Sequence, residues 1–168
     1  LKNINEKNNQ DKTTPAAVYE EGESMSAIKA VPSLGIDPTT GQELFMKKDG
    51  TITYTWDATD KVICGDSEPK VFGNVGTNLY WKRWNLNMVF KDDLGADYYN
   101  STLAERVEGA NPRYNADRRV LNNRWKDPGQ HALYKNIKEY TTTYISSRFV
   151  QKENTLQLTS LSLSYDLN

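Results

Sequence analysis

The sequence has one cysteine and one histidine among its 168 residues. A single cysteine excludes an internal disulfide and a cysteine-cluster metal site. A single histidine excludes a histidine pair for zinc and argues against a chymotrypsin-like triad. We therefore expect no metal site of either kind. We also expect no cofactor and no catalytic residue, and we do not expect an enzyme.

An excess of charge of one sign is also missing. Lys and Arg number 21 and Asp and Glu number 22, which gives a formal net charge of −1. This balance excludes a strongly basic nucleic-acid binder and an acidic solvating tail. We therefore expect no nucleic-acid partner.

Long apolar runs are absent as well. Hydrophobic residues make up 37% of the chain, the mean hydropathy is −0.77, and no stretch approaches the roughly 18 apolar residues of a membrane-spanning helix. A membrane-spanning β-strand needs only about 9–11 residues, of which every second one can be polar. Aromatic residues, at 11%, argue against full disorder. Residues 1–20 are polar, carry no signal-peptide pattern, and are expected to be flexible.

The clearest pattern lies at residues 70–91, which predict two alternating strands joined at Lys82-Arg83. Two residues is the hairpin length, although these two are poor type I′ turn formers. One face is apolar and the other carries asparagines, namely Asn74, Asn78, Asn85 and Asn87. A soluble sheet and a strand pair of an outer-membrane barrel both fit this alternation.

The segments before and after this pair have weaker patterns. Residues 25–31 predict a short strand or a helical turn, and Asp49-Gly50 predicts a hairpin between Glu43–Lys47 and Thr51–Trp56. From residue 92 to 140 the alternation is lost, which predicts a long loop with helical turns at 101–108 and 117–125.

Strand composition returns in the last part of the chain. Residues 141–150 predict a strand, residues 152–154 a turn, and the following residues a final strand. Along that final strand the leucines change phase, which predicts a bulge or break near Thr159–Ser160.

Several short motifs occur together in a characteristic order. They are Ser33–Gly41, Gly65–Lys70, Tyr80–Lys82, Tyr98–Asn100, Asp117–Arg119, Arg124–Gly129, Ser147–Val150 and Leu161–Tyr165. On these motifs, residues 19–167 resemble the C-terminal half of SusC/RagA-type TonB-linked outer-membrane transporters of Bacteroidetes. Each motif alone is a weak indicator of this family, whereas the whole set in this order is a specific one.

The resemblance implies an all-β fold, namely an antiparallel up-and-down meander that forms part of a 22-stranded outer-membrane barrel. It implies uptake of oligosaccharides, or of peptides, with a SusD-like surface lipoprotein and the TonB complex as partners. Residues 70–91 would be a transmembrane hairpin, residues 32–69 and 92–140 extracellular loops containing a hairpin and short helices, and residues 141–167 further strands. The lipid bilayer would contact Leu79, Trp81, Trp84, Leu86, Met88 and Phe90.

The same resemblance predicts that the sequence is an internal fragment of a larger transporter. No TonB-box region, plug or closing strand is recognisable. At most six strand candidates are present, whereas the smallest membrane barrels have about eight. Open sheet edges are not tolerated in lipid.

Candidate ligand-contacting residues lie in the predicted loops. Trp125, between two cations, is a possible platform for a sugar ring, and Arg118 and Arg119 are candidates for an acidic group of the substrate or partner. Tyr98 and Tyr99 complete the set. Trp125 also has a structural interpretation as a tryptophan packed under the loop, and Arg118 and Arg119 as members of a loop salt bridge.

Two other classes of protein compete with the transporter. A soluble β-sandwich that binds glycans would share the alternating strands. A secreted glycoside hydrolase would need a pair of catalytic carboxylates, and the adjacent Asp92 and Asp93 are better explained as solvated residues at a strand end.

Overall fold

Antiparallel strands dominate the computed structural model, which describes residues 2–111, 113–114, 116–139 and 141–167. The chain divides into two compact units. Unit one comprises Leu1–Asp66 and Tyr98–Gln151, and unit two comprises Ser67–Asp97 and Lys152–Asn168. The all-β class expected from the sequence agrees with this architecture.

The described strands are β1 (Ala27–Ala30), β2 (Ser33–Ile36), β3 (Glu43–Met46), β4 (Ile52–Thr53), β5 (Val62–Asp66), β6 (Val71–Trp81), β7 (Trp84–Tyr99) and β8 (Val150–Tyr165). The described helices are α1 (Lys2–Gln10) and the short η1 (Ala58–Asp60), η2 (Leu103–Glu108), η3 (Arg118–Leu121) and η4 (Ser147–Phe149). Of the helices in the described part of the chain, none has the length and apolar character needed to cross a membrane.

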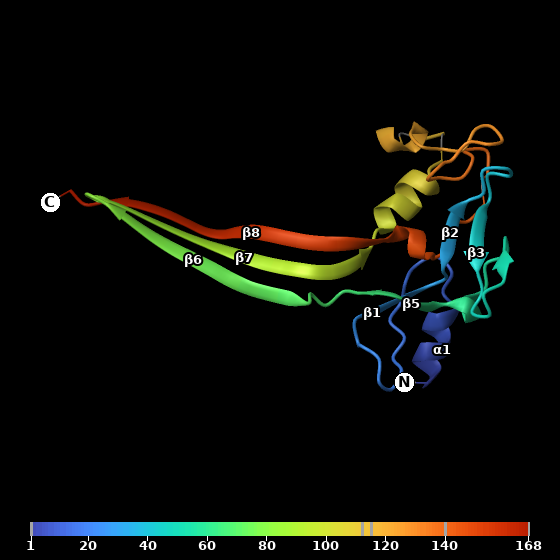
Figure 1. Cartoon of the computed structure of the whole chain (residues 1–168), viewed down its shortest axis with the longest axis horizontal. Coiled ribbons are helices and arrows are strands. Elements are labelled where there is room, and N and C mark those ends of the chain that lie inside the picture. Colours follow the sequence, from blue (N-terminus) through green and yellow to red (C-terminus); the bar gives the residue numbers. More distant parts are fainter. Residues whose placement is uncertain (1, 112, 115, 140, 168) are drawn as a thin grey trace. The chain divides into compact units, whose positions relative to one another are not determined.

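Unit two is built on the sheet β6-β7-β8, whose three strands lie side by side in chain order (Figure 1). The register pairs Trp81 with Trp84 across the two-residue turn, which confirms the predicted hairpin. Lys82 takes a left-handed φ of 55° there. The apolar residues of both strands therefore share one face, because directly paired residues project to the same side of a sheet.

The strand β7 is longer than the sequence predicted. It continues through Asp92 and Asp93 to Tyr99, so the predicted loop starting at residue 92 begins eight residues too early. Asp92 pairs with Gly73 and Asp93 with Phe72. Polar residues do not end this strand because a sheet with accessible faces leaves their side chains solvated.

The last part of the chain also differs from the prediction. Residues 141–149 contain no regular strand and end in η4, and β8 starts at Val150. The predicted turn at 152–154 lies inside β8, where the Asn154 side chain accepts a hydrogen bond of 2.8 Å from the Gly95 amide. The strand also runs through Thr159–Ser160 as one element, so the chain does not break there, and the bulge that would also account for the change of phase stays a prediction.

Unit one contains the pair β1-β5 and the sheet β2-β3-β4. The hairpin of β3 and β4 around Asp49-Gly50 confirms the turn prediction, although β4 covers only two residues. The core of unit one includes aliphatic and aromatic side chains that are at most 1% exposed, namely Ala30, Val31, Val107, Ile145 and Phe149. The pair β1-β5 joins strands distant in sequence and departs from the simple up-and-down order.

The amino-terminal segment begins with a helix, where the sequence indicated a flexible segment or loop. Residues 2–10 form α1, and its asparagines hold the following segment. Asn5 donates to the Tyr19 carbonyl and Asn8 to the Ala17 carbonyl, at 2.5 Å and 2.7 Å. The sequence-based expectation failed because these contacts are polar and cross several residues, so that hydrophobic periodicity does not reveal them.

Phe149→Ala tests the core of unit one. Its ring is 1% exposed, and truncating such a ring typically costs about 3–5 kcal/mol. We expect a clear fall in the urea midpoint of unfolding, measured by tryptophan fluorescence. Tyr114→Ala, at a side chain that is 75% exposed, is the control and should leave the midpoint within error; equal effects of the two would contradict this assignment of the core.

Candidate functional site

A buried ion cluster joins three segments of unit one. Arg148 of η4 contacts Glu43 of β3 through Nη2 at 2.8 Å and Glu108 of η2 through Nη1 at 2.9 Å. The two glutamate side chains are 4% and 0% exposed and the arginine side chain 12%. Burial alone would lower the pKa of Arg148, but the two carboxylates outweigh it and hold the pKa above its ordinary value.

A second buried arginine lies beside this cluster. Arg124 is 4% exposed and donates to backbone carbonyls instead of carboxylates. Its partners are the carbonyls of Val107, Glu108, Val120 and Lys135. Two of these belong to the last residues of η2, where unpaired helix carbonyls favour a cation. Burial lowers the pKa of Arg124, with Glu108 opposing the shift.

Trp125 is packed against a turn. Its indole nitrogen donates to the Pro38 carbonyl at 2.8 Å. A Cβ placed on Gly41 would lie 2.6 Å from the indole ring, and Gly41 has a φ of +75°. Only glycine combines this conformation with so close an approach. The turn thus occupies part of the ring surface that a sugar would need, and the role of Trp125 in substrate contact stays a prediction.

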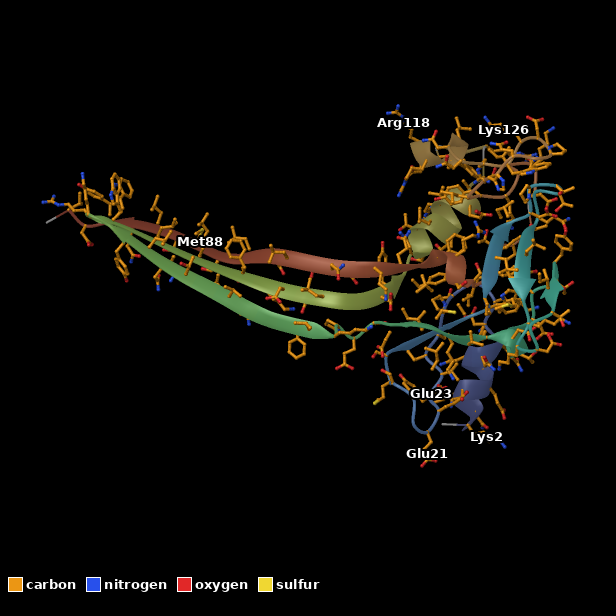
Figure 2. The ribbon with its side chains drawn as sticks, in the orientation of Figure 1. Lys2, Glu21, Glu23, Met88, Arg118 and Lys126 are labelled. Atoms are coloured by element: carbon orange, nitrogen blue, oxygen red, sulfur yellow. The ribbon has the colours of Figure 1, made fainter. Side chains whose placement is uncertain are left out.

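Arg118 and Arg119 differ in their surroundings. Arg119 forms a two-point contact with Asp117, with distances of 3.0 Å and 2.7 Å, and this contact lowers the pKa of Asp117 to about 2. Arg118 is exposed and projects from the ribbon (Figure 2). Both arginines are exposed, but Arg119 is already engaged by Asp117, so Arg118 is the better candidate for a partner carboxylate, and this contact also stays a prediction.

Tyr98 and Tyr99 are adjacent in β7 and have separate environments. The Tyr98 hydroxyl donates to the Gln151 side chain at 3.0 Å, and the Asn100 amide contacts both groups. The Tyr99 ring packs edge-on against Phe149 with centroids 6.0 Å apart. The structure therefore does not bring the two tyrosines into one site.

A recess of about 200 Å³ lies in unit one. Aromatic, hydroxyl and charged side chains line it, including Phe45, Tyr54, Lys135, Glu139, Thr141 and Tyr144. The Tyr144 ring is stacked on Trp56 at 5.1 Å, and the Tyr54 hydroxyl donates to Asp37 at 2.6 Å. Rings held in this way and adjacent polar groups form the mixed surface that polar organic ligands require.

The sequence-based candidates do not line this recess. Arg148, Glu43, Glu108, Arg124 and Lys135 were missed because they come from segments that local patterns do not connect. The sequence motifs partly indicated the two arginines. Arg124 lies in the motif Arg124–Gly129 and Arg148 in the motif Ser147–Val150, and both motifs belong to the ordered set that carries the resemblance. Their roles depend on burial, which the sequence motif alone does not specify.

The predicted lipid-facing residues share one face of the sheet in unit two. The register places Leu79 opposite Leu86, Thr77 opposite Met88 and Val75 opposite Phe90. Leu79, Trp81 and Trp84 are 53%, 67% and 43% exposed, and Leu86, Met88 and Phe90 are half-buried. Their contact with lipid stays a prediction.

Comparisons with known proteins support the fold. A scan of protein families and a search of curated proteins find no match. Among solved structures, the RagAB peptide transporter matches with a TM-score of 0.66 and 18% identity over 83% of this chain and 16% of that chain. The RagAB peptide importer in the 'closed-closed' state matches with a TM-score of 0.66, 19% identity and the same coverage. At this identity the likeness shows the fold, and the chain spans about 16% of the length of the chains it matches.

Arg148→Met tests the ion cluster. Removing the arginine leaves two carboxylates in a buried environment, and breaking a buried ion pair typically costs about 3–5 kcal/mol. We expect a strong loss of stability in thermal unfolding. Arg119→Met removes an exposed pair and should leave the unfolding temperature nearly unchanged, because exposed ion pairs contribute little to stability. The cluster has no structural role if both variants unfold at the wild-type temperature.

Proposed function

We propose that this chain is a segment of a TonB-dependent outer-membrane importer. The observation that carries the proposal is the sheet β6-β7-β8, in which an apolar face and an asparagine-bearing face are both accessible. In a barrel wall, lipid covers the apolar face and the hydrated interior covers the polar face. The fold shared with RagAB transporter chains supports this interpretation.

The length of the strands supports the same conclusion. β6 has 11 residues, and β7 and β8 have 16 each. Strands of soluble proteins average about 5–6 residues, whereas a tilted strand needs about 9–11 residues to cross the hydrocarbon layer. Each of the three strands is therefore long enough to span a membrane.

Aromatic residues gather at the turn between β6 and β7. Trp84 packs against Tyr165 with ring centroids 4.8 Å apart, and Trp81 is the neighbour of Trp84 across the hairpin. The Lys82 ammonium lies 5.1 Å from the Trp81 ring. Amphipathic rings beside a cation are typical of the boundary between hydrocarbon and headgroups.

Loop lengths support an orientation. Outer-membrane barrels have short periplasmic turns and long extracellular loops. The Lys82-Arg83 turn would then face the periplasm. Residues 32–69 would then face outside. The long segment between β7 and β8, which the sequence predicts as residues 92–140, would face outside as well.

Partners and substrate follow from the resemblance in the sequence motifs. We propose a SusD-like lipoprotein as the surface partner, the TonB complex as the energy source and an oligosaccharide as the substrate. A short peptide is the second candidate, because the two similar structures are described as a peptide transporter and a peptide importer. Transport would proceed by non-covalent binding, without a chemical step.

The soluble sandwich has less support. A sandwich buries its apolar face against a second sheet, whereas Leu79 and Trp81 are 53% and 67% exposed. The hydrolase is also weakly supported, because Asp92 and Asp93 are consecutive in β7 and consecutive strand residues project to opposite faces.

Cell fractionation tests the proposed function directly. An antibody against residues 100–139 should detect a protein in the outer-membrane fraction, at a mass several times the 19.2 kDa of this chain. Markers for periplasm and inner membrane serve as controls. A soluble or secreted band at 19.2 kDa would contradict the proposal and favour the sandwich module.

A pair of neighbouring substitutions in β7 tests the two faces. Met88 lies on the apolar face and appears on the sheet of unit two in Figure 2, and Asn87 lies on the opposite face. Arginine on the lipid side near the bilayer midplane costs about 2–4 kcal/mol. Met88→Arg should therefore reduce the amount of protein in the outer membrane, as measured by blotting, whereas Asn87→Arg should leave it nearly unchanged. The opposite ranking would overturn the assignment of faces.

A further inference from the structure

A buried lysine, Lys135, lines the recess in unit one. Lys135 is 8% exposed, and its Nζ donates to the Thr141 hydroxyl at 3.1 Å. Among the described residues no carboxylate lies within 4 Å of this nitrogen. An ammonium has three donors, and its contacts with the described residues use one of them.

The backbone at this position is held firmly. The Lys135 amide donates to Glu108 Oε1 at 3.1 Å, and its carbonyl accepts from Arg124 Nη1 at 3.0 Å. Both partners belong to the buried arginine and glutamate cluster. The ammonium is therefore presented from a fixed point and not from a mobile surface loop.

Charges in this region do not balance. The buried cations are Arg124, Arg148 and Lys135, whereas the buried carboxylates are Glu43 and Glu108. Both carboxylates already contact Arg148. These buried groups include one more cation than carboxylates, and Lys135 is the cation among them that lines the recess.

The other residues that line the recess indicate which parts of a ligand would lie beside its negatively charged group. Tyr54 and Tyr144 provide aromatic surface, and Thr141 and Thr142 provide hydroxyls. Two carboxylates, Glu43 and Glu139, also line the recess. Glu43 is already paired with Arg148, and Glu139 is exposed and forms no ion pair with Lys135 among the described contacts.

We propose that this recess binds a carboxylate group of the transported substrate, with the Lys135 ammonium as its counter-ion. The proposal rests on the proposed importer function and narrows its substrate to acidic molecules. A carboxylate matches the free donors of Lys135 and the adjacent threonine hydroxyls, because charge-assisted hydrogen bonds of this kind are short and strong. The ring of a sugar acid, or the terminal residue of a peptide, would lie against the two tyrosines.

Two matched pairs of probes test this and distinguish the two sources of the carboxylate. The first pair is trigalacturonic acid and its methyl ester, and the second is tetra-alanine and its C-terminal amide. Calorimetry on the purified full-length protein in detergent measures the four dissociation constants. We expect a preference of about 10- to 100-fold for the acid in one of the two pairs, which is the range for a hydrogen bond to a charged group.

Variants then assign the preference to one residue. Lys135→Met should abolish it and Lys135→Arg should retain part of it. Lys138→Met, which removes the same charge from an exposed neighbour, should keep it in full. Lys135→Gln replaces the methionine variant if that variant fails to fold, and the comparison of acid and neutral probes on the unmodified protein requires no variant.

Other results would overturn the carboxylate site. These are equal affinities within both pairs, no binding by any probe, or a preference that survives Lys135→Met. If the protein nevertheless fractionates with the outer membrane, the importer function stands and only the carboxylate site is lost. A soluble protein would remove the importer function itself.

Discussion

The contact of Arg148 with Glu43 and Glu108 is the constraint on which unit one depends. It joins β3, η2 and η4, which are far apart in the sequence. The net charge of this trio is negative, and the neighbouring Arg124 and Lys135 compensate for it. Because buried charges are costly without partners, each member fixes the position of the others, and the same cluster holds the backbone of Lys135.

The sequence predicted the features that local pattern controls. The hairpin at Lys82-Arg83, the turn at Asp49-Gly50 and the common apolar face of residues 71–90 all depend on alternation or turn chemistry between neighbours. The structure confirms each of them. The helical turns near residues 103 and 118 were also located, although η3 covers only Arg118–Leu121 of the predicted 117–125.

What the sequence did not predict depends on contacts across the chain. The end of β7 was misplaced because Asp92 and Asp93 resemble loop residues, and only their pairing with β6 shows otherwise. The order of α1 depends on two asparagine side chains that reach residues 17 and 19. The sequence-based candidates Trp125, Arg118 and Arg119 were chosen by residue type and do not line the recess, and their roles stay predictions. Lys135 was missed because an isolated lysine has no local pattern and its burial is a tertiary property.

The asparagine-bearing face of unit two has a consequence for permeation. Asn78 pairs directly with Asn87, and every such amide both donates and accepts hydrogen bonds. Such amides bind water in either orientation, and the charges of Lys91 and Asp93 on the same face cancel in an ion pair of 2.8 Å. If this face lines the proposed pore, it would keep the pore hydrated and admit neutral and ionic solutes alike. Discrimination between substrates would then have to occur before they reach this part of the pore.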